Sequence, residues 1–448
     1  MQKNRAVSNA AWIISCRIVQ ALLNLVVSML SARYLGPSNY GLISYAASVV
    51  AFVVPVMQLG LRSTLVQEII DRPDREGEVL GTSLALTAVS SLACMIGVFA
   101  FSVVANPGEP VTWWVCGLYS ISLLFQATEM IQYWFQAKLI SKYISLTSLG
   151  AYILVSAYKI WLLIAQKSVL WFAVANSIDF FLISATLFLL YHRFSPQRLS
   201  VSPKLIRPLL KKSGFFIISG LMVTIFAQTD RLMLKAMMDE EAVGIYSAAV
   251  TAAGMTSFLF AAIIDSVRPT VFEGSKISRE VCESRIVTCY SIIIYLSLAQ
   301  SVVFTVLAGL IIRVLFGGDY AASADVLRVV TWYTTFSYMG PVRNIWMLLE
   351  NKQKYLWMVN LIGAASNVVL NLFLIPVMGI MGAAVASVIT QFVTNFLIGY
   401  VLKGIRYNNT LIFRGFSPKP MLRALRAAFR QFAAAFQRFL GRKKRDRA

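Results

Sequence analysis

Residues 213–238 form a largely apolar stretch of 26 residues that carries two adjacent opposite charges, Asp230 and Arg231. About 20 helical residues cross the hydrocarbon core of a bilayer, so this stretch is long enough to span a membrane. A charge near the centre of such a helix costs about 2.5–3.5 kcal/mol and usually faces protein or a water-filled cavity. Adjacent residues point about 100° apart on a helix. Asp230 and Arg231 therefore each need a partner from another helix, or a ligand.

The composition extends this conclusion to the whole chain. Of 448 residues, 58% are hydrophobic and only 14% are charged, which is typical of a polytopic membrane protein and not of a soluble domain. The net charge of +21 would ordinarily suggest a nucleic-acid partner. The Lys and Arg residues, however, are concentrated in short loops and a C-terminal tail. We therefore expect membrane lipids as partners and no nucleic acid.

Apolar periodicity predicts an all-α protein with about twelve transmembrane helices. If the N-terminus is cytoplasmic, 32 of the 41 Lys and Arg residues fall on the cytoplasmic side. This bias predicts an even number of spans with both termini cytoplasmic. The predicted spans are residues 9–33, 40–61, 80–106, 111–136, 143–166, 169–191, 213–238, 243–268, 287–313, 325–350, 355–377 and 380–403.

The chain divides near its middle. Residues 192–212 contain three prolines and six basic residues, which predicts a cytoplasmic linker that continues neither flanking helix. On either side lie two six-helix lobes, residues 1–191 and 213–403. A similar phrase occurs in each lobe, around Gly41 and Gly244, which are 203 residues apart. A repeat at this spacing is common in secondary transporters.

Residues 404–448 form a basic tail. Between residues 419 and 440, apolar side chains recur every three or four residues and Lys or Arg occupies much of the remaining surface. This pattern predicts an amphipathic cytoplasmic helix that binds the anionic inner leaflet. A helix that docks on a partner protein and a loosely ordered tail are the alternatives.

Nothing in the sequence indicates bond-making chemistry. The only histidine, His192, lies at a loop edge, and the five cysteines lack metal-binding spacing. No Ser/His/Asp set, nucleophile elbow or phosphate-binding glycine loop is present. We therefore expect a transporter and not an enzyme, with no cofactor beyond coupling to H⁺ or Na⁺.

Three arginines lie deep in the predicted spans: Arg17, Arg231 and Arg343. At different heights, they would line an electropositive cavity between the lobes. A planar guanidinium makes bidentate, charge-assisted bonds to phosphate. The alternative for each arginine is a structural ion pair with a neighbouring span.

Other polar residues in the spans also have two interpretations. A carboxylate in a region of low dielectric constant suits proton coupling, but it can equally make a structural pair. Hydrogen-bonding and aromatic side chains can contact sugars, but they also occur in ordinary helix packing. The carboxylates are Asp230, Glu129, Asp179 and Asp265, of which Asp265 lies three residues before Arg268; the candidate glycan contacts are Gln58, Gln126, Gln228 and Tyr45.

Five segments carry a resemblance to a known family. They are Ala32–Gly41 (ARYLGPSNYG), Gln228–Arg231 (QTDR), Leu315–Tyr320 (LFGGDY), Asn367–Pro376 (NVVLNLFLIP) and Gly379–Ala384 (GIMGAA). In this order and spacing, residues 5–403 resemble the Wzx-type polysaccharide flippases of the multidrug/oligosaccharidyl-lipid/polysaccharide exporter superfamily. The basic tail is not part of this resemblance.

The resemblance implies two six-helix lobes that form a V around a cationic cavity, in a multi-pass protein of the bacterial inner membrane. It also implies translocation of undecaprenyl-pyrophosphate-linked O-antigen or capsule units to the periplasmic leaflet by alternating access. Polymerase or assembly proteins would be further partners. The alternatives are a flippase for another lipid carrier, such as a peptidoglycan or teichuronic-type precursor, and a small-molecule exporter of the same superfamily.

Overall fold

The computed structural model describes residues 2–195, 197–424 and 426, with side chains from residue 16 onward except Arg17. Within this part of the chain every regular element is a helix. The helices before the midpoint are α1 (Gln2–Met57), α2 (Leu65–Asp71), α3 (Glu76–Ala105), α4 (Pro110–Ser120), α5 (Ser122–Thr128), α6 (Ile131–Ala137), α7 (Lys142–Ile164) and α8 (Val169–Phe194).

The second half has longer helices at its start and shorter ones at its end. They are α9 (Pro203–Met237), α10 (Glu240–Gly254), α11 (Ser257–Ile277), α12 (Arg279–Leu315), α13 (Ser323–Ser337), α14 (Met339–Leu349), α15 (Leu356–Met378), α16 (Ile380–Phe392), α17 (Ile398–Val401) and α18 (Arg406–Gly415). A π-helix, Val393–Leu397, joins α16 to α17.

Nine helices of the described chain are long and apolar enough to cross a membrane, or ten if the bent pair α10 and α11 counts as one span. The sequence predicted about twelve spans. Two features account for the difference between ten and twelve. Helix α1 contains two predicted spans that meet at Gly36, where φ is 70° and ψ is 172°. Helices α13 and α14 cover the predicted span 325–350 but are not in this count.

The predicted linker is shorter than expected. Helix α8 continues to Phe194 and α9 begins at Pro203. Residues 192–194 and 203–212 are therefore helical, and the prediction that the segment 192–212 continues neither flanking helix is wrong. Pro203 occupies the first turn, where the missing N–H costs nothing, and Pro208 forfeits a single backbone bond.

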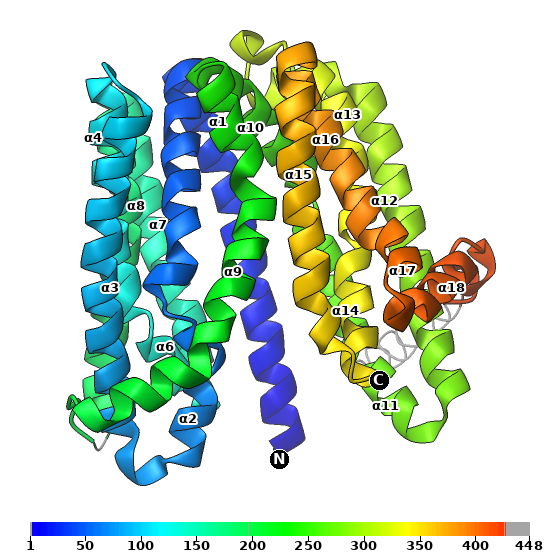
Figure 1. Ribbon diagram of the computed structural model, residues 1–448, viewed down its shortest axis with the longest axis horizontal. Coiled ribbons are helices and arrows are strands. Elements are labelled where there is room, and N and C mark those ends of the chain that lie inside the picture. Colours follow the sequence, from blue (N-terminus) through cyan, green and yellow to red (C-terminus); the bar gives the residue numbers. More distant parts are fainter. Residues whose placement is uncertain (1, 196, 425, 427–448) are drawn as a thin grey trace, which may run out of the picture.

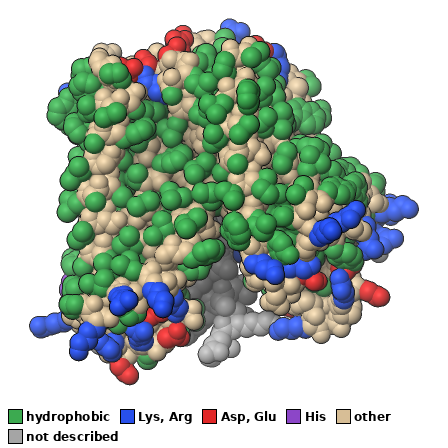
Figure 2. Space-filling model, viewed as in Figure 1, with side chains coloured by type: hydrophobic (Ala, Val, Ile, Leu, Met, Phe, Trp, Pro, Cys, Tyr) green, Lys and Arg blue, Asp and Glu red, His purple; other side chains and the backbone are tan. Residues whose placement is uncertain are grey.

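The helices form two bundles (Figure 1). Helices α2 to α8 lie on the left and α11 to α18 on the right. Helix α9 and the N-terminal part of α1 run through the middle, and α10 lies beside α1 at the top. The middle of the molecule is covered by hydrophobic side chains, whereas Lys and Arg gather at its lower end (Figure 2). Large apolar side chains such as Val104, Phe373 and Val377 are mostly exposed. Such a surface is stable only in lipid, so the chain is a multi-pass membrane protein.

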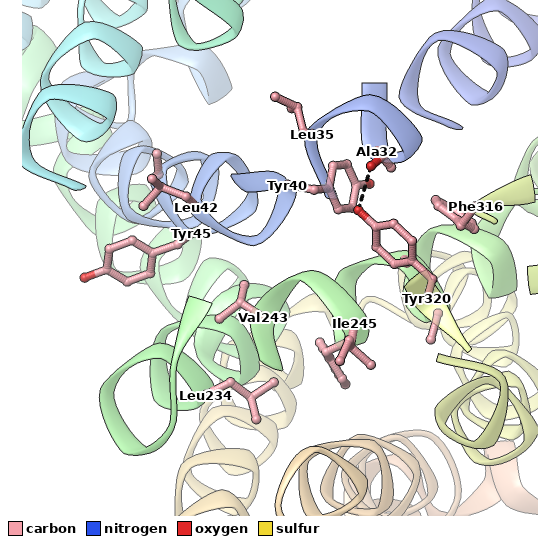
Figure 3. Close-up of a cluster of buried hydrophobic side chains, with 14 of the residues drawn as sticks. Ala32, Leu35, Tyr40, Leu42, Tyr45, Leu234, Val243, Ile245, Phe316 and Tyr320 are labelled. Atoms are coloured by element: carbon pink, nitrogen blue, oxygen red, sulfur yellow. Dashed lines mark hydrogen bonds between the residues drawn. The ribbon is translucent and has the colours of Figure 1, made fainter. Parts of the chain in front are cut away.

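The bundles meet at the upper end of Figure 1, in an apolar cluster that we call the upper interface (Figure 3). Its centre is the crossing of α1 and α10. A Cβ on Gly41 would lie 1.7 Å from the carbonyl oxygen of Glu240, and one on Gly244 would lie 2.0 Å from that of Pro37. The two glycines of the repeated phrase therefore meet at one crossing. The cluster includes Ala32, Leu35, Tyr40, Leu42, Tyr45, Leu234, Val243, Ile245, Phe316 and Tyr320.

Polar contacts reinforce the upper interface. The Arg33 guanidinium donates to three carbonyls at the C-terminus of α12, including that of Leu315 at 3.0 Å. The Tyr320 hydroxyl donates to the carbonyl of Ala32 at 2.9 Å (Figure 3). The segments around residues 32–41 and 315–320, noted in the sequence for their resemblance, thus contact each other.

Lys235 adds an ion pair between the bundles. Its side chain is only 4% exposed, and Nζ lies 2.8 Å from Oε2 of Glu109 and 2.7 Å from Oε2 of Glu240. We expect Lys235→Met to destabilise the protein by about 2 kcal/mol. This is less than the roughly 3–5 kcal/mol lost when one partner of a fully buried ion pair is removed, because both carboxylates here remain accessible to water. Thermal melting in detergent measures the effect, and Lys235→Arg should retain most of the stability.

The segment after the last predicted span is partly structured. Helix α18 packs beneath α12, with Leu411 and Ile412 buried, and the Tyr290 hydroxyl donates to Asn408 Oδ1 at 2.9 Å. The predicted amphipathic helix at 419–440 lies largely outside the described residues. Residues 419–424 and 426, which are described, are helical.

Candidate functional site

Asp230 is the centre of a buried polar network in the second bundle. Its side chain lies on α9 and the residue is 7% exposed. Oδ1 accepts hydrogen bonds from Nδ2 of Asn367 at 2.9 Å and of Asn371 at 2.7 Å, both on α15. Oδ2 accepts from the hydroxyls of Tyr246 on α10 and Ser387 on α16, each at 2.5 Å. Four neutral donors thus satisfy a carboxylate for which the sequence predicted a partner on another helix.

Arg231 points along a different side of α9. Its Nε donates to Ser247 Oγ and its Nη1 to Gln228 Oε1, both at 3.0 Å. Gln228 Oε1 also accepts from Ser48 Oγ of α1 at 3.0 Å, which links this arginine to the first bundle. Arg231 and Asp230 both line a cavity of about 310 Å³, which we call the upper cavity.

Arg343 lies on α14 beside a second cavity of about 230 Å³, the lower cavity. The residue is 6% exposed, and Nη1 donates to the carbonyl of Thr394 at 2.5 Å. Its Nε has no hydrogen-bond partner among the described residues. Phe226, Ser337 and Gln391 line both cavities, so the two are neighbours.

Neither cavity arginine forms a salt bridge in the described chain. Arg343 is buried and Arg231 is half-buried, and a guanidinium withdrawn from water without a carboxylate partner is costly, because its desolvation is not offset by an opposite charge. The arrangement therefore favours an anionic ligand. It brings Arg231 and Arg343 into adjoining cavities, but every residue that lines them belongs to the second lobe, residues 213–403, whereas the sequence analysis expected a cavity between the lobes. The side chain of Arg17 on α1 is not described.

Residues that the sequence analysis did not name as site residues complete the site, although Asn367 and Asn371 lie in one of the resemblance segments. Asn360, Asn367 and Asn371 lie at steps of seven and four on α15, and Ser387 and Gln391 at a step of four on α16. These spacings place each set on one helical face. Polar side chains that recur on one face of an otherwise apolar helix are the sequence pattern by which these residues could have been identified.

The remaining predicted carboxylates lie apart from this site. Asp265 Oδ1 is 3.4 Å from Arg268 Nη2, so it makes the structural pair that was one of its two interpretations. Glu129 follows α5 in the first bundle, half-buried, and its carboxylate makes none of the hydrogen bonds or ion pairs found among the described residues.

Asp179 on α8 lines a cavity of about 280 Å³ in the first bundle, together with Asn24 and Tyr152. The Tyr152 hydroxyl donates to Asn24 Oδ1 at 2.8 Å. Asp179 Oδ1 is buried without a partner in the described residues. This carboxylate is therefore available to a proton or cation that enters the cavity.

Of the four candidate glycan contacts, only Gln228 reaches the site, where it holds Arg231. Gln126 is buried and donates to Ser122 Oγ at 3.4 Å. Tyr45 is buried in the upper interface, where its hydroxyl accepts from Asn106 Nδ2 at 3.1 Å. Gln58 lies at the C-terminal end of α1 and lines neither the upper nor the lower cavity.

Comparison with solved structures shows the fold. The chain matches the lipid II flippase MurJ in an inward closed conformation with a TM-score of 0.70 and 15% identity, over 94% of this chain and 92% of that one. It matches an inward-facing multidrug resistance transporter of the MATE family, from the same exporter superfamily, with a TM-score of 0.61 and 14% identity, over 88% and 96%. A superfamily transporter from Pyrococcus furiosus, described as having a binding pocket of reverse polarity, gives 0.57 and 14%, over 91% and 95%.

No curated protein matches the chain in sequence. Residues 6–275, which include α1, the upper interface on α10 and the Asp230–Arg231 pair, match a family model described as polysaccharide biosynthesis protein. This multi-pass membrane protein, with the fold of the multidrug/oligosaccharidyl-lipid/polysaccharide exporters, therefore belongs to the polysaccharide biosynthesis protein family.

Proposed function

We propose that this protein flips undecaprenyl-pyrophosphate-linked oligosaccharide units from the cytoplasmic to the periplasmic leaflet of the bacterial inner membrane. The product would supply surface polysaccharide synthesis, with polymerase and assembly proteins as partners. The observation that carries the proposal is the pair of guanidinium groups in adjoining cavities without a carboxylate partner among the described residues. A pyrophosphate supplies the missing negative charge.

The same proposal includes the topology. Twelve spans in two lobes, residues 1–191 and 213–403, would place both termini in the cytoplasm. The accumulation of Lys and Arg at the lower end of Figure 2 supports this orientation. With the lobes joined at the upper interface, the site would then face the cytoplasm, where the substrate is made. Transport would require the upper interface to separate.

Ion coupling fits the carboxylates. Asp230 is held by four neutral donors and not by a cation, so taking up a proton would release at least one of these hydrogen bonds. Asp179 lies beside a cavity of the other lobe, and its Oδ1 has no partner in the described chain. We propose that one of them exchanges H⁺ or Na⁺ during transport. Asp265 is a weaker candidate for coupling because it pairs with Arg268 at the surface, and Glu129 is weaker because it lines none of the three cavities.

Deletion of the gene tests the function. We expect lipid-linked units to accumulate on the cytoplasmic face and surface polysaccharide to be lost. Leaflet-specific labelling of the lipid-linked sugar and staining of surface glycan measure these outcomes, and restoration by the wild-type gene is the control. Normal surface polysaccharide in the deletion strain would refute the proposal.

A further inference from the structure

The lower cavity combines one cation with several carboxamides. Arg343, Asn344, Asn360, Gln391 and Asn395 line it, and we call this set the carboxamide pocket. Its volume of about 230 Å³ is below the roughly 300–1,000 Å³ of pockets for drug-sized ligands, so it suits a single small ring. It adjoins the upper cavity, into which a longer ligand can continue.

The walls of the pocket are held in place. The π-helix Val393–Leu397 frees backbone carbonyls from the regular ladder, and one of them, Thr394 O, accepts from Arg343 Nη1. Asn395 Nδ2 donates to Gln391 Oε1 at 2.7 Å, which orients both amides. A Cβ on Gly363 would lie 2.7 Å from Thr394 Cγ2, so glycine lets α15 approach this wall closely.

The charge in the pocket selects an anion. Arg343 is 6% exposed and its Nε lacks a protein partner in the described chain, although guanidinium has five donors in a fixed plane. No described carboxylate lines the lower cavity. An anionic oxygen beside Nε would satisfy both the charge and the unpaired donor.

The amides favour a ligand that both donates and accepts hydrogen bonds. A site for phosphate alone needs only donors, but each carboxamide also presents an acceptor oxygen. Asn344 and Asn360 line the pocket without a side-chain hydrogen bond to any described residue, so their oxygens and N–H groups are both available. Hydroxyl and acetamido groups, which donate and accept, match this lining.

We propose that the carboxamide pocket is a subsite for a phosphosugar, in which Arg343 binds the phosphate and Asn344, Asn360 and Gln391 bind the sugar ring joined to it. This inference rests on the proposed function and adds where the first sugar of the lipid-linked unit lies. The second phosphate of the pyrophosphate lies toward Arg231 in the adjoining upper cavity.

Binding to the purified full-length protein in nanodiscs tests the subsite. The probes are N-acetylglucosamine 1-phosphate, glucose 1-phosphate, inorganic phosphate and undecaprenyl pyrophosphate. At least one sugar phosphate should bind about tenfold more tightly than phosphate, since two additional hydrogen bonds contribute this much. Asn360→Leu should remove that preference and leave phosphate affinity within about twofold, whereas Arg343→Gln should weaken all anions by about tenfold or more.

The surface residue Arg328, which pairs with Asp325, supplies the matched control Arg328→Gln, with unchanged binding of every probe. Asn344→Ala is a second test of the sugar contact, because Asn344 is exposed and its loss should not impair folding. Equal affinities of the wild-type protein for sugar phosphates and phosphate would overturn the proposal, as would a retained preference in both asparagine variants.

The outcomes separate this inference from the proposed function. If deletion traps lipid-linked units but the sugar preference is absent, the flippase function stands and the subsite is refuted. If deletion has no effect on surface glycan but the preference is present and depends on Asn360, the subsite stands for a free sugar phosphate. If undecaprenyl pyrophosphate binds, and its binding depends on Arg343 and not on Asn360, then the phosphate that occupies the pocket is that of the lipid carrier and not of a free sugar phosphate.

Discussion

Replacing Arg343 with glutamine is expected to reduce glycan transport by about 10²-fold without lowering the stability of the protein. The loss follows from two charge-assisted hydrogen bonds to the substrate, each contributing about 1.5–3 kcal/mol. Stability should be unchanged or higher, because the substitution removes a buried charge that pairs with no described carboxylate. Among the described residues, the substitution removes one hydrogen bond of this guanidinium, the bond from Nη1 to Thr394 O.

Surface glycan, protein level and melting temperature must be measured on the same strains. Arg328→Gln serves as the control, since this arginine is exposed and pairs with Asp325. Arg343→Lys should recover only part of the transport, because an ammonium keeps the charge but not the bidentate geometry. A parallel fall in stability and transport would instead assign Arg343 a structural role.

Arg343 and Lys235 show how a ligand-binding cation can be distinguished from a structural one. Lys235 is buried between two carboxylates and holds the bundles together, whereas Arg343 is equally buried and has one carbonyl partner in the described chain. The sequence places both in apolar helices and cannot distinguish them. The distinction depends on whether acids from other helices are brought close, which only packing decides.

Much of the fold could be predicted because membrane spans and positive loops are local signals. The resemblance segments were recognised, but their contacts were not. Residues 32–41 meet 315–320 at the upper interface, while Asp230 meets Asn367 and Asn371 in the site. These contacts join positions more than 130 residues apart, and no periodicity encodes such a pairing.

The other large effect is expected at Gly41. In Gly41→Ala the new methyl group would lie 1.7 Å from the Glu240 carbonyl oxygen, so α1 and α10 must separate by more than an ångström. Overpacking of this kind costs about 3 kcal/mol, at the upper end of its usual range, because the clash is with backbone and no side chain can rotate away. We expect a markedly lower melting temperature in detergent and loss of transport.

Gly97→Ala is the matched control. Gly97 lies in α3 with no heavy atom within 4 Å of the added methyl group, and alanine favours a helix by about 1 kcal/mol, so no loss is expected. Gly244→Ala should resemble Gly41→Ala, since its methyl group would meet Pro37 O at 2.0 Å. The double variant should cost less than the two single effects combined, because the first substitution already separates the helices. If Gly41→Ala melts like Gly97→Ala, the crossing of α1 and α10 does not hold the bundles together, and closure of the upper interface would have to depend on Arg33, Lys235 and Tyr320.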